Sequence, residues 1–369
     1  MNTTLLKTLT GVGILTVFLA IGLHVRIGNG ATHAGRNAGQ TRQPSQASTN
    51  NDTVTNSNSE FVPAYLELHT SGELAKRAHE LWSMLESCNL CPRNCGVNRL
   101  AGERGYCRAP GSDLVIASVQ PHFGEERPLV GRGGSGTIFF SHCNLRCVFC
   151  QNYQISILGR GSRISVEQLA NAMLELQQFG SHNINVVTPT HFTPHIVAAI
   201  DIAAGRGLRL PIVWNTSGWE HVEVLQLLDG IVDIYLPDMK FAFGEDSQTY
   251  ADSPSYPEQT KRAVLEMHRQ VGVAHPGAAG IIKRGLMIRH LVMPDNAGGS
   301  KQVLDWIATN LPADTYINIM EQYSPHHQAF NYPRIARRTT PVEYQSVVNY
   351  AHELGLSNLD SRTARWLNN

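Results

Sequence analysis

Apolar residues in the middle and C-terminal parts of this chain fall into six short runs, separated by stretches with a helical period. We expect the short runs to be β-strands, because they are bounded by turn residues and rich in aliphatic and aromatic side chains. The expected strands are 136–140, 183–187, 211–214, 231–236, 286–293 and 316–320.

The stretches between these runs carry apolar residues at helical spacing. The clearest begins at Ser165, which is placed to form a capping box with Gln168, and it ends before Gly180. Because strands alternate with helices, we predict an α/β fold with a parallel sheet and right-handed crossovers. The expected helices are 165–179, 194–205, 220–228, 257–271 and 300–310, with a further one at 341–354.

The N-terminal region follows neither pattern. Residues 8–25 contain no Lys, Arg, Asp or Glu, and this length is at the lower end of what crosses a bilayer. Residues 26–60 are rich in Asn, Gln, Ser, Thr and Gly, so we expect a disordered tether. No acidic residue precedes Asp52, a bias typical of an organellar transit peptide. A membrane anchor and a later translation start are the alternatives.

Composition limits the partners. The 369 residues are 42% hydrophobic and include 30 basic and 30 acidic residues. This length is sufficient for one large domain with extensions. The balanced charge gives no general attraction to nucleic acid, so we expect no nucleic-acid partner.

The first of two cysteine groups has four thiols. They can complete the ligand shell of a zinc ion or of an iron–sulfur cluster, and their spacing does not separate these two metals. We expect the metal site formed by this first group, a second metal site of the chain, to be independent of the other cysteine group. Its members are Cys88, Cys91, Cys95 and Cys107.

The second group is Cys143, Cys147 and Cys150, in C-x3-C-x2-C spacing directly after an expected strand. Three thiolates suggest a [4Fe-4S] cluster with one iron left open for a small molecule. Seven cysteines in metal-like spacings disfavour disulfides. Because an oxidising environment attacks thiolates, we favour a mitochondrial site, or a membrane-anchored one facing a reducing compartment, over secretion.

This second group, with Phe149 before its last cysteine, resembles the signature of the radical S-adenosylmethionine (radical SAM) superfamily. Further motifs point to one branch of this superfamily. They are the segments 122–126 and 134–140 and the sequences Cys-Pro-Arg-Asn-Cys and Cys-Val-Phe-Cys-Gln-Asn. The chain is similar there to pyruvate formate-lyase activating enzyme-like iron–sulfur proteins, over residues 81–352. The resemblance implies a partial (β/α)6 TIM-like barrel, with its chemistry at the C-terminal ends of the strands.

With this resemblance, the chain divides into five expected parts. An N-terminal hydrophobic targeting or anchor segment leads into a disordered polar linker, a Cys-rich metal-binding domain, the radical SAM partial barrel and a helical tail. Their expected ranges are 1–30, 31–75, 76–130, 131–323 and 324–369.

The resemblance also implies a chemistry. The three cysteines of the second group would hold the cluster, and its open iron would bind the amino and carboxylate groups of S-adenosylmethionine. Reductive cleavage would then give a 5′-deoxyadenosyl radical that removes hydrogen from a substrate. No catalytic side chain is assigned. The expected cofactor contacts are Phe149 near the adenine, Thr188, Asn215, Asp238 and Lys240 in segments that follow strands, and Arg289 within the expected strand 286–293.

The sequence does not identify the substrate or the partner proteins. The hydrogen donor would be a glycine of another protein or a small molecule, and a flavodoxin- or ferredoxin-like protein would supply electrons. The alternative is a non-catalytic scaffold in which His142 or His191 joins the second cysteine group to bind zinc. We expect the barrel mouth to be framed by Thr190, His191, Glu321 and Tyr323.

Overall fold

The computed structural model describes residues 61–277 and 279–368. The predicted anchor segment, and the linker up to residue 60, lie outside the described residues. The linker predicted to reach residue 75 is shorter, because helices α1 (Tyr65–Thr70) and α2 (Glu73–Ser83) occupy its last part. Tyr65 and Leu74 are fully buried, so these helices belong to the folded core. No helix of the described residues is long and apolar enough for a bilayer span.

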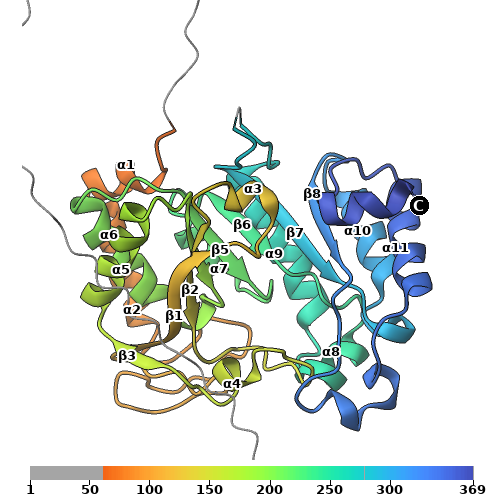
Figure 1. Cartoon of the computed structure of the whole chain (residues 1–369). Coiled ribbons are helices and arrows are strands. Elements are labelled where there is room, and N and C mark those ends of the chain that lie inside the picture. Colours follow the sequence, from red (N-terminus) through yellow and green to blue (C-terminus); the bar gives the residue numbers. More distant parts are fainter. Residues whose placement is uncertain (1–60, 278, 369) are drawn as a thin grey trace, which may run out of the picture. The chain divides into compact units, whose positions relative to one another are not determined.

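One eight-stranded sheet organises the fold, in the order β3-β1-β2-β4-β5-β6-β7-β8 (Figure 1). From β2 to β8 all neighbours are parallel. These six strands confirm the α/β class and agree with the expected partial (β/α)6 barrel. Their bounds are β2 Ser135–Phe140, β4 Ile184–Val187, β5 Ile212–Thr216, β6 Ile234–Pro237, β7 Gly285–Leu291 and β8 Tyr316–Met320.

The remaining two strands are antiparallel and were not expected. β1 (Leu114–His122) pairs with β2, and the short β3 (Ser162–Ile164) pairs with β1 at the edge of the sheet. Sequence patterning misses β1 because only its first residues are buried, while its second half is partly exposed and includes Pro121.

All five expected helices between the strands are present, with shifts of one or two residues at most ends. Ser165 and Gln168 form the predicted capping box at the start of α5. Helix α8 was missed, because its polar sequence has little amphipathic signal. The longer helices are α5 Val166–Gln178, α6 Thr193–Gly205, α7 Val222–Leu227, α8 Gly244–Ala251, α9 Tyr256–Val271, α10 Ser300–Asn310 and α11 Pro341–Glu353.

The C-terminal ends of the parallel strands meet at one rim of the sheet, where the short helices α4 (Tyr153–Ser156) and α8 lie (Figure 1). Beyond β8, the C-terminal tail covers the last strand. The hydroxyls of Tyr344 and Thr363 both donate to the carbonyl of Ile319, at 2.7 and 2.9 Å. The tail is therefore packed on the barrel as well as helical.

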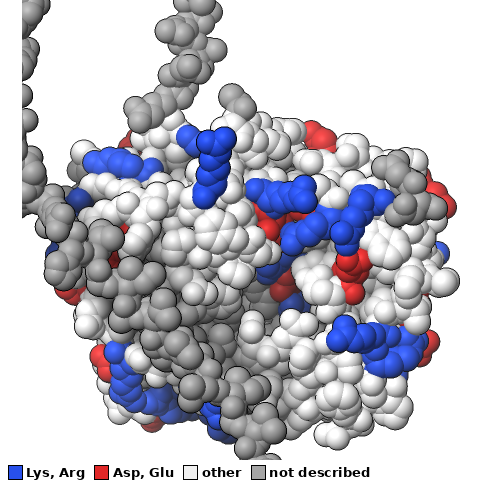
Figure 2. All heavy atoms as spheres, in the orientation of Figure 1, with Lys and Arg blue, Asp and Glu red and all other residues white. Residues whose placement is uncertain are grey.

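Surface charge is mixed on the face shown in Figure 2, where basic and acidic side chains lie next to each other near the centre. This agrees with the equal numbers of basic and acidic residues. The absence of a nucleic-acid partner stays a prediction.

Candidate active site

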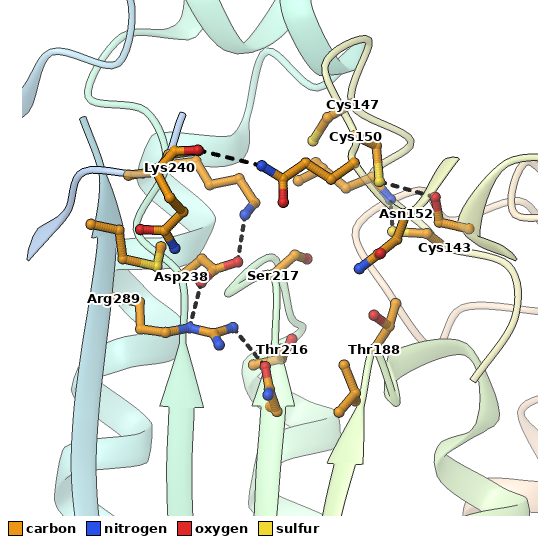
Figure 3. A pocket seen from close by; sticks show the side chains of 18 of the residues that line it. Cys143, Cys147, Cys150, Asn152, Thr188, Thr216, Ser217, Asp238, Lys240 and Arg289 are labelled. Carbon is orange, nitrogen blue, oxygen red and sulfur yellow. Dashed lines mark hydrogen bonds and ion pairs between the residues drawn. The ribbon is translucent and has the colours of Figure 1, made fainter. Parts of the chain in front are cut away.

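A pocket of about 420 Å³ opens at the rim of the barrel. Cys143, Cys147 and Cys150 all line it, as the sequence predicted. Two further lining residues, Gln151 and Asn152, are exposed, so the pocket reaches solvent beside the cysteines. Figure 3 shows the three cysteines on one side of this pocket and the charged side chains of the neighbouring strands on the other.

The cysteines lie on the three-cysteine loop (residues 141–152), which connects β2 to α4. Its backbone turns sharply, with positive φ at His142 (72°) and Arg146 (57°). Backbone bonds tie it to distant segments: the Ser141 amide donates to the carbonyl of Val115 at 2.8 Å, the Val148 amide to that of Tyr250 at 2.8 Å, and the Gln328 amide to the carbonyl of Val148 at 2.9 Å. The loop therefore depends on contacts from outside for its shape.

Polar groups already approach two of these thiols. The Leu145 amide donates to the Cys143 sulfur at 3.4 Å, and the Cys150 sulfur lies 3.1 Å from the Ser156 hydroxyl. Burial raises the pKa of Cys143 and Cys147 above the usual thiol range. Thiolates at this position therefore need a metal or another cation to hold their charge.

Four predicted cofactor contacts form one hydrogen-bonded network opposite the cysteines (Figure 3). The Arg289 guanidinium donates to Asp238 at 2.8 Å and to the Asn215 side-chain oxygen at 2.6 Å. Lys240 pairs with the other oxygen of Asp238. Burial alone would raise the pKa of Asp238, but Arg289 and Lys240 lower it below its ordinary value. The network is thus a fixed set of charges facing the pocket.

The other two predicted contacts also line the pocket. Phe149 packs against Phe241 and Tyr323, with ring centroids 6.2 and 5.8 Å apart. Thr188 has a φ of 61°, which is costly for a β-branched residue and is a kind of strain that clusters at functional sites. Its amide donates to the carbonyl of Asn215 at 2.8 Å. The loop after β4 is thereby tied to β5.

At its other end the pocket carries two adjacent carboxylates that the sequence analysis did not assign to the site. The side-chain amide of Asn318 donates to the carboxylate of Glu126 at 2.8 Å, and a Glu125 carboxylate oxygen lies 3.9 Å from the Arg289 guanidinium. The pKa of Glu125 is raised to about 7. Burial is the largest cause, and the charge of the neighbouring Glu126 is the second. Arg362, from the C-terminal tail, lies 3.6 Å from Glu126. The sequence signal for these glutamates was the segment 122–126, which carried part of the family resemblance, and nothing local indicated Arg362.

The four cysteines of the first group line a second, much smaller cavity of about 10 Å³. They belong to the four-cysteine segment (residues 88–107), which contains no helix or strand. Backbone amides of Tyr106 and Ala109 donate to the sulfurs of Cys95 and Cys107 at 3.4 and 3.5 Å. The Arg99 guanidinium lies 3.8 Å from the Cys88 sulfur.

Among the described residues, no group of three or more His, Cys, Asp or Glu side chains is arranged to hold a single metal ion, and this is true of both cysteine groups.

The histidines expected to complete a zinc site, His142 and His191, do not line the pocket with the three cysteines. His191 instead lines the four-cysteine cavity, and its Nε2 donates to the carbonyl of Ser141 at 2.7 Å.

The prediction of which residues frame the barrel mouth is also wrong in part. Of its four residues only Tyr323 lines the pocket, since Thr190 is buried against Glu220 and Glu321 pairs with Arg365.

Comparison with known proteins gives three results. Residues 137–271 match the family model described as the Radical SAM superfamily. The chain is 32% identical over 283 residues to the uncharacterized protein MJ0674 of Methanocaldococcus jannaschii, covering 74% of this chain and 77% of that protein. A crystal structure of methylornithine synthase matches 60% of this chain and 69% of its own, with 13% identity and a TM-score of 0.40.

Proposed function

We propose that this chain, which belongs to the radical SAM superfamily, uses a [4Fe-4S] cluster to cleave S-adenosylmethionine reductively and to remove hydrogen from a substrate. The observation that carries the proposal is the pocket itself. Its lining combines Cys143, Cys147 and Cys150 with the charged network of Asp238, and all of these residues except Arg289 lie within the region that matches the superfamily.

The residues fit the group that the superfamily binds. Three cysteines leave one iron of a four-iron cluster for the cofactor. The Leu145 amide and the Ser156 hydroxyl already point at sulfurs of this set, and such bonds orient and stabilise thiolate ligands. When bound, the cluster supplies one electron to the sulfonium and the cofactor supplies the radical that abstracts hydrogen.

The chain's own part is to bind, orient and exclude water. In this proposal Phe149 contacts the adenine, and Thr188 and Asn215 offer backbone and side-chain polar atoms to the amino-acid or ribose groups. Lys240 or Arg289 meets the cofactor carboxylate. Because Asp238 already fixes both cations, little rearrangement is needed when an anionic group arrives.

For the substrate we propose two candidates, in order of preference. Similarity to activating enzyme-like proteins favours a glycine of another protein, with a flavodoxin- or ferredoxin-like electron donor. The pocket opens to solvent beside Gln151 and Asn152, which suits an incoming loop. A small molecule is the second candidate, favoured by the half-buried Glu125 and the buried Glu126 at the far end, which offer hydrogen-bonding groups inside the pocket.

The four-cysteine segment is proposed to hold a second metal centre, zinc or iron–sulfur. Arg99 carries this proposal, because it is only 1% exposed and, within the described residues, forms no ion pair with a carboxylate. Its guanidinium donates to the carbonyl of Pro110 at 2.6 Å, but a buried charge without an opposite charge is costly. Metal-bound thiolates of the four cysteines in this segment would supply the missing negative charge.

The test is anaerobic reconstitution with iron and sulfide, reduction, and measurement of 5′-deoxyadenosine by mass spectrometry. We expect about four iron atoms at the barrel site and release of 5′-deoxyadenosine that depends on reductant. A reconstituted, reduced protein that releases none would overturn the proposal. Deuterium transfer from glycine-deuterated peptides would identify a protein substrate, and its absence from every peptide would exclude the activating-enzyme role.

A further inference from the structure

Arg93 connects the four-cysteine segment to the three-cysteine loop. Its Nε donates to the carbonyl of Asn144 at 2.9 Å, and its Nη2 to that of Leu145 at 3.3 Å. These two carbonyls lie between the first and second cysteines of the loop. The side chain of Arg93 is only 10% exposed, so these bonds are shielded from water.

The same guanidinium is held from other directions. It donates to the carbonyls of Ala251, at 3.0 Å, and Asp252, where helix α8 ends. Its Cζ atom lies 3.6 Å from the ring centroid of Tyr106 and 4.6 Å from that of Trp219. A guanidinium has five donors in a rigid fork, and here it joins the three-cysteine loop, α8 and the four-cysteine segment at one point.

The position of Arg93 depends on the cysteines beside it. Its backbone lies between Cys91 and Cys95, in a turn where the Asn94 amide donates to the carbonyl of Cys91 at 3.0 Å. Asn94 has a positive φ of 44°. The four-cysteine segment has no helix or strand to hold this turn. A metal bound by Cys91 and Cys95 would therefore fix the base from which Arg93 extends.

His191 makes a second connection between the two cysteine groups. Its ring lines the four-cysteine cavity, and its Nε2 donates to the carbonyl of Ser141 at 2.7 Å, where the three-cysteine loop begins. The Nδ1 atom of this buried ring has no hydrogen-bond partner. Arg93 and His191 thus contact the loop on both sides of Cys143.

We propose that the four-cysteine centre is a metal-dependent support for the three-cysteine loop, acting through Arg93 as a positioning residue, with His191 as a lesser contact. The proposal rests on the second metal centre proposed above, and it replaces the independence of the two groups that was expected from the sequence. Losing the metal would free Arg93, and the carbonyls of Asn144 and Leu145 would lose their donors.

The test uses the full chain and reads the loop directly, so it does not depend on cofactor cleavage. Amide hydrogen exchange of residues 141–152 is measured in Arg93→Ala and in the Cys91→Ser/Cys95→Ser double variant, with iron and zinc counted in each. We expect exchange at least about tenfold faster in both, and iron at the barrel site at least halved. Arg93→Ala should retain the metal of the four-cysteine segment.

Combining the changes sharpens the test. If Arg93 transmits the effect, adding Arg93→Ala to the cysteine double variant should change loop exchange little further, whereas independent effects would add. Arg104→Ala is the matched control, because Arg104 is an exposed arginine of the same segment that donates to Arg108. Unchanged loop exchange in the cysteine variant, or full additivity, would overturn the proposal.

Arg93→Lys covers the case in which Arg93→Ala does not fold. Lysine keeps the charge but cannot reach several carbonyls with a rigid fork. We expect intermediate loop exchange and an altered electron paramagnetic resonance signal of the reduced cluster on adding S-adenosylmethionine. A Lys variant identical to wild type in both readouts would count against the positioning role. Failure of the wild-type chain to cleave the cofactor would refute the proposed function but leave this exchange test valid.

Discussion

The two cysteine groups of this chain differ in the space around their thiols. Cys143, Cys147 and Cys150 line a pocket of about 420 Å³ that reaches solvent, whereas the four-cysteine segment encloses about 10 Å³. Around the larger space stand charged and aromatic side chains from several strands. The polar side chains that line the smaller one, besides the cysteines, are Arg93, Arg99 and His191.

In the proposed function, this difference distinguishes a centre that exchanges ligands from a centre that stabilises the structure. Three thiols beside a large open pocket leave both a coordination position and room for a substrate. In the proposed second metal centre, four thiols around a small cavity leave neither, and their ionisation would compensate the buried charge of Arg99. The predictions below test this division from the largest expected effect to the smallest.

The largest effect is expected at the three-cysteine loop. Replacing Cys143, Cys147 or Cys150 singly by Ala should reduce release of 5′-deoxyadenosine to background, because each would anchor one iron of the cluster. Thermal unfolding of the three variants should stay close to that of the wild-type chain without a cluster. Retained cofactor cleavage in any one variant would show that its thiol is not a ligand.

At the four-cysteine segment the main expected effect is on stability. Replacing all four cysteines by Ser should lower the free energy of unfolding by about 3–5 kcal/mol, because it leaves the Arg99 guanidinium buried without negative charge. Denaturant unfolding measures this loss. Adding Arg99→Met to that variant should restore part of the stability, since the unpaired charge is gone.

The rescue distinguishes charge compensation from a general loss of metal binding. A four-Ser variant as stable as wild type would contradict a structural metal centre. A variant that loses stability but is not improved by Arg99→Met would keep the metal centre and refute the role of Arg99.

A third prediction concerns the far end of the open pocket. Because the pKa of Glu125 is raised to about 7, the folded chain binds a proton there that the unfolded chain has lost. Stability contributed by the neutral carboxyl is present at low pH and is lost as the pH rises from about 4.5 to about 7. Glu125→Gln should therefore be more stable than wild type at pH 8, by up to about 3 kcal/mol.

Near pH 4.5 the two proteins should differ little, since Glu125 is then mostly protonated in the folded chain. Thermal unfolding at several pH values measures the difference, and effects of the metal centres cancel because both proteins share them. The exposed Glu245→Gln serves as the control. A Gln variant less stable than wild type at pH 8 would show that Glu125 is held ionised by Arg289 and Arg362.

The parts that sequence predicted well are local ones. The six parallel strands and the Ser165 capping box follow from periodicity and short-range hydrogen bonding. The cofactor-contact candidates were chosen one at a time by their position, most of them in segments that follow strands and Arg289 within a strand. Parallel strands bring such positions to one rim, and the structure joins Asn215, Asp238, Lys240 and Arg289 in one network.

The parts that sequence missed depend on contacts between distant segments. Nothing near Arg362 in sequence indicates that the C-terminal tail brings it to Glu126. His191 follows a strand like the site residues, yet it turns away from the pocket toward the four cysteines. The connection through Arg93 spans 51 residues, from Arg93 to Asn144, and no local pattern shows it.

The smallest expected effect tests how tightly the closed cavity is built. Gly105 has an ordinary φ, but a Cβ there would lie 2.9 Å from the Cys95 sulfur. If a metal holds this sulfur in place, Gly105→Ala forces the sulfur or the backbone to move, at a cost of about 1 kcal/mol. Gly277→Ala is the control, since its nearest contact would be an ordinary 3.5 Å from the carbonyl of Ile281. Competition with a chelator should show metal held about fivefold more weakly in Gly105→Ala than in the control. Equal retention would mean that the Cys95 sulfur is free to shift and is not a metal ligand.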